Sequence, residues 1–385
     1  MKSFENLRII DLTRILSGPF CTMYFADLGA DVIKIESPAG DDTREWGPPF
    51  VNGESSYFLS VNRNKKSVVL DLKSPEGRLA LEKMIRTCDV VVENFRPGTM
   101  ERLGIGFKNL VEWNPQVILA SISGFGQTGP YADVPGYDVI AQGMGGLMAV
   151  TGEPDSPPVK PGFSLADVSA GMWAVIGILT ALRQRDLDPS PQWIDVSLLE
   201  SMMAFQTYAA GNYFATGVDP TPMGSAHPNI CPYQAFAAED GFFNLAVGND
   251  HLWHLFCRAV GHAEWMEDPR FATNPQRVSH RAVLVDLLTS LFSTQPVKHW
   301  VALLRGVGVP CGPIYRLSEL YQDPYVEERN MVFTVNHPIA GAVRQVATPI
   351  KFLNTTEPPH LLNDPPPTLG QHTQHILHQF GVEWD

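Results

Sequence analysis

The sequence predicts an α/β fold, in which a doubly wound parallel sheet is joined to a second, smaller α+β unit. Its 385 residues are too many for one ordinary domain at about 150 residues each. Its first 130 residues alternate strand-like and helix-like stretches. Helices between successive strands make right-handed crossovers, so the strands run parallel with helices on both faces. Hydrophobic residues at 44% and charged residues at 18% exclude a disordered chain.

Each element of the first unit follows from a short, mainly apolar run and the turn residues beside it. DVIKIE at 31–36 and QVILASIS at 116–123 are typical of strands buried on both faces. Gly29 ends the helix expected over 20–28. The other strands of this sheet are expected at 7–13, 67–72, 89–95 and 192–199.

The later residues predict a long helix and a domain boundary. A buried helix is expected over 164–185, where apolar residues end at a charged stretch. Residues 216–232 are rich in Gly, Pro, Asn and Thr, which is typical of a linker. The large domain is therefore expected at 1–215 and again at 330–385, and the small α+β domain at 233–329.

The charge balance is acidic, with 28 Lys and Arg against 41 Asp and Glu, a net charge of −13. Phosphate backbones repel such a surface, which disfavours a nucleic-acid partner. An anionic ligand therefore needs a local group of cations. Candidates follow the expected strands, where parallel sheets bind ligands: Lys34, Arg44, Lys73, Arg96 and Arg102. Ordinary surface residues without a ligand are an equally good interpretation.

The cysteines and apolar runs indicate a cytoplasmic protein without a membrane partner. Five dispersed cysteines with no CxxC pair favour a reducing compartment over a disulfide or zinc framework. The N-terminus carries charges through its only apolar stretch, unlike a signal peptide. The longest apolar run, 172–182, is shorter than the ~18 residues that a membrane span requires.

The loop GFGQTG at 124–129 matches G-x-G-x-x-G and follows an expected strand. Pro130 and more loop come next, where a dinucleotide site needs a helix, so we expect a ligand-facing glycine loop rather than NAD binding. No metal or prosthetic group is expected, because two groups of histidines are more typical of helix faces than of metal sites. These groups are His251 and His254, and His372, His375 and His378.

Asp167 has two compatible interpretations. It follows Ser164 by three residues at the start of the long helix, which is the pattern of a capping box. A helix N-terminus also keeps a carboxylate ionised, and a carboxylate can attack an activated acyl group. The local sequence does not choose between a cap and a nucleophile.

Long segments of the chain resemble the class III coenzyme A transferases, the group of formyl-CoA transferase and the CaiB/BaiF proteins. The resemblance runs over nearly the whole chain and is closer to the acyl-CoA:dicarboxylate CoA-transferases than to the racemases of this group. The segments that carry it are DLTRILSGPFCTMYFADLGADVIKIE at 11–36, NRNKKSVVLDLKSPEG at 62–77, DVVVENFRPGTMERLG at 89–104, ILASISGFGQTGP at 118–130, PGYDVIAQGMGG at 135–146, PGFSLADVSAGMWA at 161–174, HPNICPYQAF at 227–236 and GVPCGPIY at 308–315.

The resemblance implies a Rossmann-like large domain, a smaller domain and an interlocked homodimer. It implies that Asp167 is the catalytic nucleophile, and that acyl-CoA and a free carboxylic acid, such as a small dicarboxylate, are the substrates. It places Tyr137 and Gly248 in the substrate pocket. The positions that it implies for CoA contact are Ile15, Leu16, Ser17, Leu70, Lys73, Asn94, Phe95 and Arg102.

The resemblance also implies a mechanism and leaves two alternatives. CoA passes through an aspartyl anhydride and an aspartyl-CoA thioester, and a glycine-rich loop closes over them in some relatives, where this chain has AVGND at 246–250. Leu16 replaces a glutamine of formyl-CoA transferase, which makes formyl-CoA an unsuitable donor. An α-methylacyl-CoA racemase is the first alternative, but its proton-transfer residues fall on Tyr137 and His251, and tyrosine is a poor base. A catalytically inactive CoA-binding protein is the second.

Overall fold

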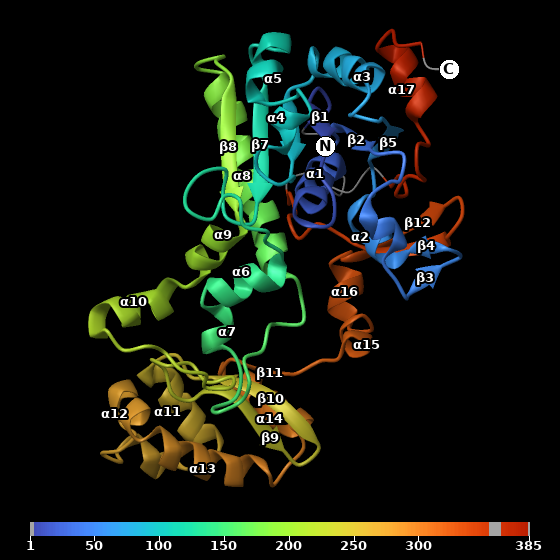
Figure 1. Ribbon diagram of the computed structural model, residues 1–385. Coiled ribbons are helices and arrows are strands. Elements are labelled where there is room, and N and C mark those ends of the chain that lie inside the picture. Colours follow the sequence, from blue (N-terminus) through green and yellow to red (C-terminus); the bar gives the residue numbers. More distant parts are fainter. Residues whose placement is uncertain (1–3, 354–362, 384–385) are drawn as a thin grey trace. The chain divides into compact units, whose positions relative to one another are not determined.

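The computed structural model describes residues 4–353 and 363–383 (Figure 1). The chain forms two compact units. Unit 1 comprises Met1–Leu147, Lys160–Gly211 and Tyr325–Asp385, and unit 2 comprises Met148–Val159 and Asn212–Pro324. The linker expected at 216–232 stays a prediction, as do the domain boundaries beside it.

Unit 1 contains a six-stranded parallel sheet, which confirms the predicted α/β class. Its strands lie in the order β5-β2-β1-β6-β7-β8 (Figure 1). The strand bounds are β1 Arg8–Asp11, β2 Asp31–Glu36, β5 Lys66–Val69, β6 Val90–Glu93, β7 Ile118–Ser123 and β8 Gln192–Ser197. Numbered among these six strands alone, the order is 3-2-1-4-5-6, so the direction of winding reverses between β1 and β6, the position where doubly wound sheets bind ligands.

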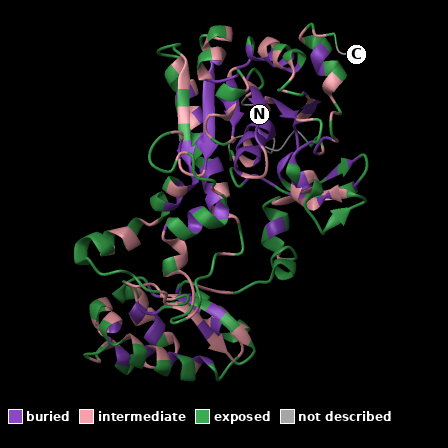
Figure 2. Ribbon diagram, viewed as in Figure 1, coloured by how far each residue is buried: buried purple, intermediate pink, exposed green. Residues whose placement is uncertain are grey.

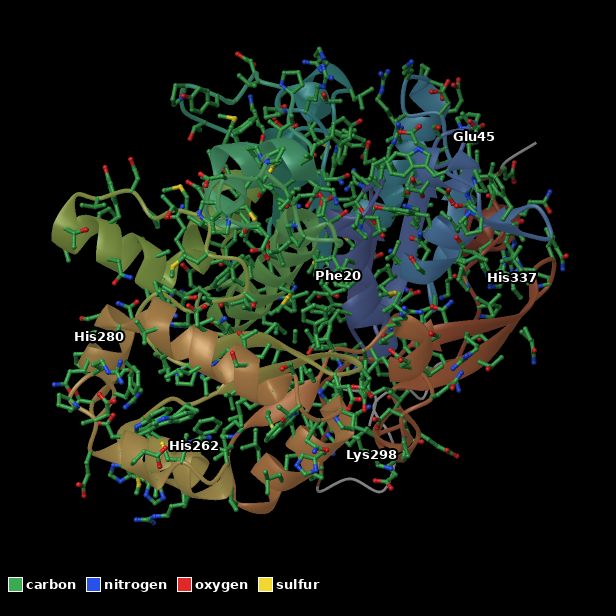
Figure 3. All side chains as sticks on the ribbon, turned by 90° about the horizontal axis from the view of Figure 1, so that it is seen from below. Phe20, Glu45, His262, His280, Lys298 and His337 are labelled. Carbon is green, nitrogen blue, oxygen red and sulfur yellow. The ribbon has the colours of Figure 1, made fainter. Side chains whose placement is uncertain are left out.

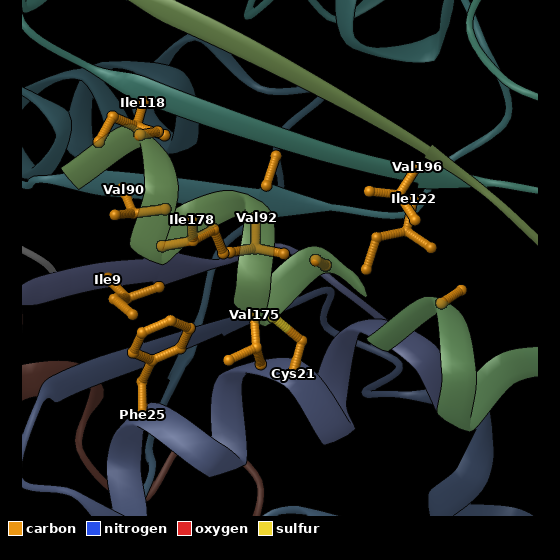
Figure 4. Packing of buried hydrophobic residues seen from close by; sticks show 14 of the residues in the cluster. Ile9, Cys21, Phe25, Val90, Val92, Ile118, Ile122, Val175, Ile178 and Val196 are labelled. Atoms are coloured by element: carbon orange, nitrogen blue, oxygen red, sulfur yellow. The ribbon is translucent and has the colours of Figure 1, made fainter. Parts of the chain in front are cut away.

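Helices cover both faces of this sheet because its strands alternate apolar side chains between two cores. Ile9 packs into one core and Ile10 into the other. The first core lies under α1 (Ser17–Asp27) and α8 (Leu165–Arg185), as Figure 4 shows for Cys21, Phe25 and Ile178. The second core lies under α3 (Pro75–Ile85), α5 (Phe107–Trp113) and α17 (Thr373–Gln379).

Helix α8 is long and apolar enough to cross a membrane by length and composition alone. Its inward face is made of small and apolar residues, including Ala166, Ala170, Ala174 and Ile178, which are fully buried against α1 and the sheet. Packing of this kind is typical of a core helix, so a single such helix is weak evidence for a membrane span.

The C-terminal residues complete the edge of the sheet in unit 1. After the hairpin of β12 (Val332–His337) and β13 (Gly341–Val346), the chain returns to the outer edge of β5. There the backbone N–H of His372 donates to the carbonyl of Ser67 at 3.0 Å. The Ser67 N–H donates in turn to Nδ1 of His372 at 3.1 Å. The tail thus takes the place of a further strand.

Unit 2 is an α+β unit built on a three-stranded antiparallel sheet. The sheet has the order β11-β10-β9. Its strands are β9 Tyr233–Ala238, β10 Gly241–Ala246 and β11 Cys311–Pro313. Its helices are α11 Asp250–Ala259, α12 Asn274–Ser279, α13 Arg281–Phe292 and α14 Val297–Gly306. An aromatic core that includes Trp253, Phe256 and Phe292 holds these layers together (Figure 2 shows the buried positions).

Shorter elements join these layers. They are η1 Asp42–Glu45, β3 Phe50–Val51, β4 Glu54–Ser55, α2 Ser56–Val61, α4 Thr99–Arg102, α6 Asp138–Met144, α7 Leu147–Val150, α9 Leu198–Phe205, α10 Thr207–Thr216, η2 Ala263–Met266, α15 Leu317–Leu320 and α16 Pro324–Glu328.

Candidate active site

The loops after β1 and β6 are joined across the point where the winding of the sheet reverses. The backbone N–H of Arg14 donates to Oδ1 of Asn94 at 2.8 Å, and Nδ2 of Asn94 donates to the carbonyl of Arg14 at 2.7 Å. The Arg14 guanidinium also lies 5.8 Å from the centre of the Phe95 ring. Asn94 and Phe95 are two expected CoA contacts. They therefore lie beside the loop at 15–17, which carries three more of the expected CoA contacts.

The loop that leads into α1 has a backbone shape set by buried groups. Ile15 has a φ of 70°, and its N–H donates to Oδ1 of Asp41 at 3.3 Å. Gly18 packs against Thr13 so closely that a Cβ atom there would lie 2.3 Å from the threonine side chain. Leu16 is the N-cap of α1, and no side chain caps the helix, so its first amide groups are not occupied by a side chain.

Two of the cations that were candidates for binding an anionic ligand form ion pairs within the fold instead. Nζ of Lys34 is fully buried and lies 2.9 Å from Oδ2 of Asp41. Arg44 pairs with Glu36, at 2.7 Å from Nε to Oε2. The burial of Lys34 therefore removes it from the candidates for an anion site, and Arg44 is already engaged by Glu36 within the fold. Buried charges must be paired, and a residue at the end of a strand is as close to the core as to the crevice.

A second buried pair anchors the end of β1. Nζ of Lys65 lies 3.1 Å from Oδ2 of Asp11, and both side chains are fully buried. Burial alone raises the pKa of Asp11, but the ammonium groups of Lys65 and Lys34 outweigh it and bring the pKa to about 2. Asp11 stays ionised and also accepts from Thr13 and Thr22. The start of the loop is thus held rigidly.

The other three candidate cations, which follow β5 and β6, are exposed to solvent. The side chains of Lys73 and Arg96 are exposed, and Arg102 is exposed with an Nη2 to Thr99 Oγ1 distance of 2.7 Å. Leu70 is buried directly after β5, where its N–H donates to the carbonyl of Glu36 at 2.9 Å. The eight positions expected for CoA thus follow β1, β5 and β6, all at the carboxyl edge of one sheet.

Asp167 lies in the first turn of α8, but the predicted capping box does not form there. Ser164 is the N-cap, and its side chain makes no capping hydrogen bond. Its place is taken by Asp138, the first residue of α6, whose Oδ1 accepts from the N–H of Ala166 at 2.9 Å and of Asp167 at 3.3 Å. Because Asp138 caps the helix from outside, the Asp167 side chain is free of the capping role.

The expectation that the helix N-terminus keeps the Asp167 carboxylate ionised is not met, because the surroundings of Asp167 make its carboxyl group unusually basic. Burial and the nearby Asp138 charge raise its pKa to about 7. Burial raises the pKa of Tyr57 to about 12, with a contribution from the charges of Asp167 and Asp138. The Tyr57 ring packs edge-on against Trp46 at 5.2 Å between centres. A carboxyl group of this kind is strongly nucleophilic when ionised and neutral at slightly acidic pH.

Helix packing places Asp167 beside the expected CoA loop. Gly171 lies one turn after Asp167 on the same face of α8. A Cβ atom on Gly171 would lie 2.6 Å from the carbonyl oxygen of Ser17 and 3.0 Å from the ring of Phe20, which is labelled in Figure 3. The backbones of α8 and α1 therefore touch one turn away from the carboxyl group.

The other expected pocket residues lie in different settings. Tyr137 is the N-cap of α6, directly before Asp138, and its side chain is 62% exposed. The glycine loop at 124–129 does not lead into a helix, since α6 begins only at Asp138, and it packs on the same turn, with Gly124 close to Gly136. Gly248 is an exposed residue between β10 and α11 of unit 2, so its part in the site stays a prediction.

Two of the C-terminal histidines make contacts within unit 1. His372 binds the edge of β5, and Nε2 of His375 lies 3.0 Å from Nε2 of Gln379. Within residues 4–353 and 363–383, no group of three or more His, Cys, Asp or Glu side chains is arranged to hold a metal ion.

Sequence reasoning missed three residues around Asp167. Asp138 and Gln142 lie in the PGYDVIAQ segment, and their spacing of four residues on one helix was a usable signal. Nε2 of Gln142 donates to Oδ2 of Asp138 at 2.6 Å. Tyr57 comes from α2, more than a hundred residues before Asp167, and no local pattern marks it.

The chain is similar to known proteins over its whole length. A family model described as CoA-transferase family III matches residues 4–373. The chain is 42% identical over 380 residues to succinyl-CoA:glutarate CoA-transferase of Mus musculus, with 98% of this chain and 86% of that protein covered. It is 42% identical over 357 residues to acetyl-CoA:oxalate CoA-transferase of Acetobacter aceti, with 92% and 90% covered. A crystal structure of a CaiB/BaiF family protein from Brucella suis is 40% identical with a TM-score of 0.86, and 98% of each chain is covered.

These likenesses confirm the resemblance that the sequence motifs suggested. The matched region includes both units, the loops after β1, β5 and β6, and the start of α8. The chain belongs to CoA-transferase family III and is a CoA-transferase of that class.

Proposed function

We propose that this enzyme transfers CoA from succinyl-CoA to a small dicarboxylate, with Asp167 as the covalent nucleophile. The observation that carries the proposal is the placement of Asp167: a half-buried carboxyl group with a pKa near 7, one helical turn from the contact between α8 and the start of α1. The names of the relatives support the substrate class, since two of them pair an acyl-CoA with glutarate or oxalate.

Each step of the proposed reaction exchanges one bond at a carbonyl carbon. An oxygen of ionised Asp167 attacks the thioester carbonyl of the donor, the C–S bond breaks, and CoA thiolate leaves an aspartyl anhydride. The thiolate attacks the aspartyl carbonyl, which forms an aspartyl-CoA thioester and releases succinate. The acceptor carboxylate attacks this thioester and displaces the thiolate, giving a second anhydride. The thiolate then attacks the acceptor's carbonyl and restores the Asp167 carboxylate.

The chain's own groups supply what this reaction requires. No side chain caps the N-terminus of α1, so the N–H groups of Ser17 and Gly18 favour negative charge there, whether of a phosphate or of a carbonyl oxygen. The exposed side chains of Lys73, Arg96 and Arg102 provide positive charge for CoA phosphates on an otherwise acidic protein. Tyr57 keeps its proton, and the charge of Asp167 contributes to that, so its neutral hydroxyl adds no negative charge around the nucleophile.

Mass spectrometry of CoA thioesters tests the proposal directly. In separate reactions, the purified enzyme is incubated with succinyl-CoA together with glutarate, oxalate, itaconate or acetate. We expect the new CoA thioesters of the dicarboxylates to form fastest. Asp167→Asn is expected to lose at least about 10³-fold in transfer, in line with loss of a covalent nucleophile. Asp186→Asn, at the exposed far end of α8, is the matched control.

Two outcomes contradict the proposal. Transfer by Asp167→Asn at the wild-type rate overturns the role of Asp167. Deuterium exchange at the α-carbon of a branched acyl-CoA, without any transfer to an acid, identifies a racemase instead.

Hydroxylamine added during turnover is expected to convert Asp167 to a hydroxamate, which peptide mass spectrometry locates.

We also propose that two chains assemble as an interlocked homodimer. Several large apolar side chains of α8 and α9 are about half exposed in the single chain, and a second copy would cover them. They are Met172, Ile176, Met203 and Phe205.

A further inference from the structure

Gln142 is a fully buried polar residue in α6, and its side-chain amide hydrogen-bonds to one described residue, Asp138. Its Nε2 donates to Oδ2 of Asp138, four residues earlier on the same helix, at 2.6 Å. Its Oε1 is buried and has no hydrogen-bond partner among the described residues. A buried acceptor without a partner is costly, so the bond to Asp138 must outweigh that cost.

The orientation of this amide is decided by the carboxylate. Turning the amide over would place Oε1 against Oδ2 of Asp138, where two acceptors repel each other. The N–H bond to a charged acceptor is stronger than one to a neutral group, and more so in a dry interior. Gln142 is therefore held in the one orientation that supports a negative charge on Asp138.

Asp138 passes this support on to α8. Its second oxygen, Oδ1, accepts from the backbone N–H groups of Ala166 and Asp167, at 2.9 and 3.3 Å. The side chain of Gln142, the carboxylate of Asp138 and the first turn of α8 thus form one continuous chain of hydrogen bonds. Asp138 is 9% exposed, so water has little access to this chain.

We propose that Gln142 is a positioning residue for CoA transfer: its amide holds the Asp138 carboxylate against the first turn of α8, where that charge destabilises the free Asp167 carboxylate but not its neutral acyl forms. This inference rests on the proposed role of Asp167 as nucleophile. When Asp167 attacks a thioester, an O–C bond forms, a C–S bond breaks, and the negative charge moves from Asp167 to the departing CoA thiolate. The repulsion from Asp138 is relieved at that moment, which favours the covalent intermediate.

The groups that face Asp167 allow this effect to be isolated. Asp138 comes from α6 and carries the nearby charge. Tyr57 comes from α2 and stays neutral at physiological pH. From α1, the contact one turn away is made by the Ser17 carbonyl and the Phe20 ring, which do not titrate. A change in the Asp138 charge is therefore expected to dominate any change in how Asp167 titrates.

Two substitutions of Gln142 test the proposal. Gln142→Met keeps the size of the side chain and removes the donor, so the Asp138 carboxylate is no longer held against the first turn of α8. We expect kcat/KM for succinyl-CoA to fall about tenfold, and the pH midpoint of its rise to move down by about one unit. Gln142→Glu can donate to Asp138 only while protonated. We expect it to follow the wild type at acidic pH and to lose activity at alkaline pH, which adds a descending limb. Gln184→Met, exposed on α8, is the control.

A titration that does not depend on turnover separates the two proposals. The carboxyl ¹³C signal of Asp167, assigned from its loss in Asp167→Asn, is followed with pH in the wild type and in Gln142→Met. An unchanged midpoint in Gln142→Met overturns the role of Gln142 and leaves the nucleophile untouched. Transfer by Asp167→Asn at the wild-type rate overturns the proposed function itself. If Gln142→Met does not fold, the absence of an alkaline limb in Gln142→Glu overturns the positioning role.

Discussion

At the level of single residues, there is a conflict between the stability of the fold and the reactivity of Asp167. Asp138 and Asp167 are two carboxyl groups at one helix N-terminus, and only Asp138 receives the amide hydrogen bonds there. Asp167 is left half-buried beside a like charge, which raises its pKa to about 7. A group in that position is reactive because it is poorly stabilised when ionised.

This conflict predicts that Asp167→Asn makes the protein more stable at alkaline pH. In the unfolded chain an aspartate titrates near 3.9, whereas folded Asp167 titrates near 7. The folded state binds the proton more tightly, so ionisation costs folded stability as the pH rises from about 4 to about 7. A shift of about three units corresponds to about 4 kcal/mol at most, and asparagine avoids that cost.

Thermal unfolding at several pH values checks this prediction. The difference in midpoint between Asp167→Asn and the wild type is expected to be small at pH 5 and larger at pH 8. Asp186→Asn, an exposed carboxylate on the same helix, should show no such growth. An equal difference at both pH values would mean that Asp167 titrates near its ordinary value.

At the level of elements, the strands were easier to predict than the site. The strands expected at 31–36 and 116–123 correspond to β2 and β7, because an apolar run buried on both faces is a local signal. The capping box at Ser164 was wrong because the competing cap, Asp138, comes from another helix. The role of Lys34 and Arg44 was left open for a similar reason: the sequence places them at a strand end, and only the fold reveals their partners Asp41 and Glu36.

The contact between α8 and α1 predicts that Gly171→Ala weakens binding of acyl-CoA. The added Cβ would lie 2.6 Å from a backbone oxygen, Ser17 O, which cannot move aside as a flexible side chain does. The two helices must separate, which displaces the expected CoA loop at 15–17 relative to Asp167. We expect a loss of about 1–3 kcal/mol in stability and a KM for succinyl-CoA raised several-fold.

Gly211→Ala is the matched control, since Gly211 lies within α10 and no atom lies within 4 Å of its added Cβ. Alanine there should stabilise the helix by about 0.5–1 kcal/mol and leave KM unchanged. Steady-state kinetics and thermal unfolding of both variants decide the matter. Equal effects of the two substitutions would show that the α8–α1 contact does not position the loop.

The docking of the C-terminal tail on β5 predicts a pH-sensitive edge of the sheet. Nδ1 of His372 accepts from Ser67 and must be unprotonated to do so. Burial and the charge of Lys66 lower the pKa of His372 below its ordinary value near 6.5. The contribution to stability is therefore present above that ordinary value and is lost as the pH falls below it.

Hydrogen exchange of the Ser67 amide measures this effect. We expect its protection, relative to neighbouring strand amides, to fall between pH 7 and pH 5.5 in the wild type. In His372→Asn, whose side-chain oxygen can accept the same bond without titrating, protection should stay constant. His378→Asn, exposed on α17, is expected to behave as the wild type does. Constant protection in the wild type contradicts the prediction.

At the level of the whole molecule, the acidic charge and the CoA ligand are reconciled by where the free cations lie. The net charge of −13 repels phosphates in general. Buried cations such as Lys34 and Lys65 are neutralised by their partners, whereas Lys73, Arg96 and Arg102 are exposed at the carboxyl edge of the sheet. A local positive site can therefore exist on an acidic enzyme, and its affinity for CoA should decrease with salt.

The proposed interlocked dimer predicts that subunits do not exchange under native conditions. Met172, Ile176 and Met203 are each at least half exposed in the single chain, more apolar surface than a soluble monomer usually leaves open on neighbouring helices. A partner that merely docked on this surface would dissociate and exchange, whereas chains threaded through each other must unfold first.

We therefore expect light scattering to give twice the chain mass of 42.5 kDa. When tagged and untagged dimers are mixed, mixed dimers should be absent after days in buffer and present after unfolding and refolding together. Mixed dimers that form in buffer would indicate an ordinary docked dimer, and a mass of one chain would remove the dimer altogether.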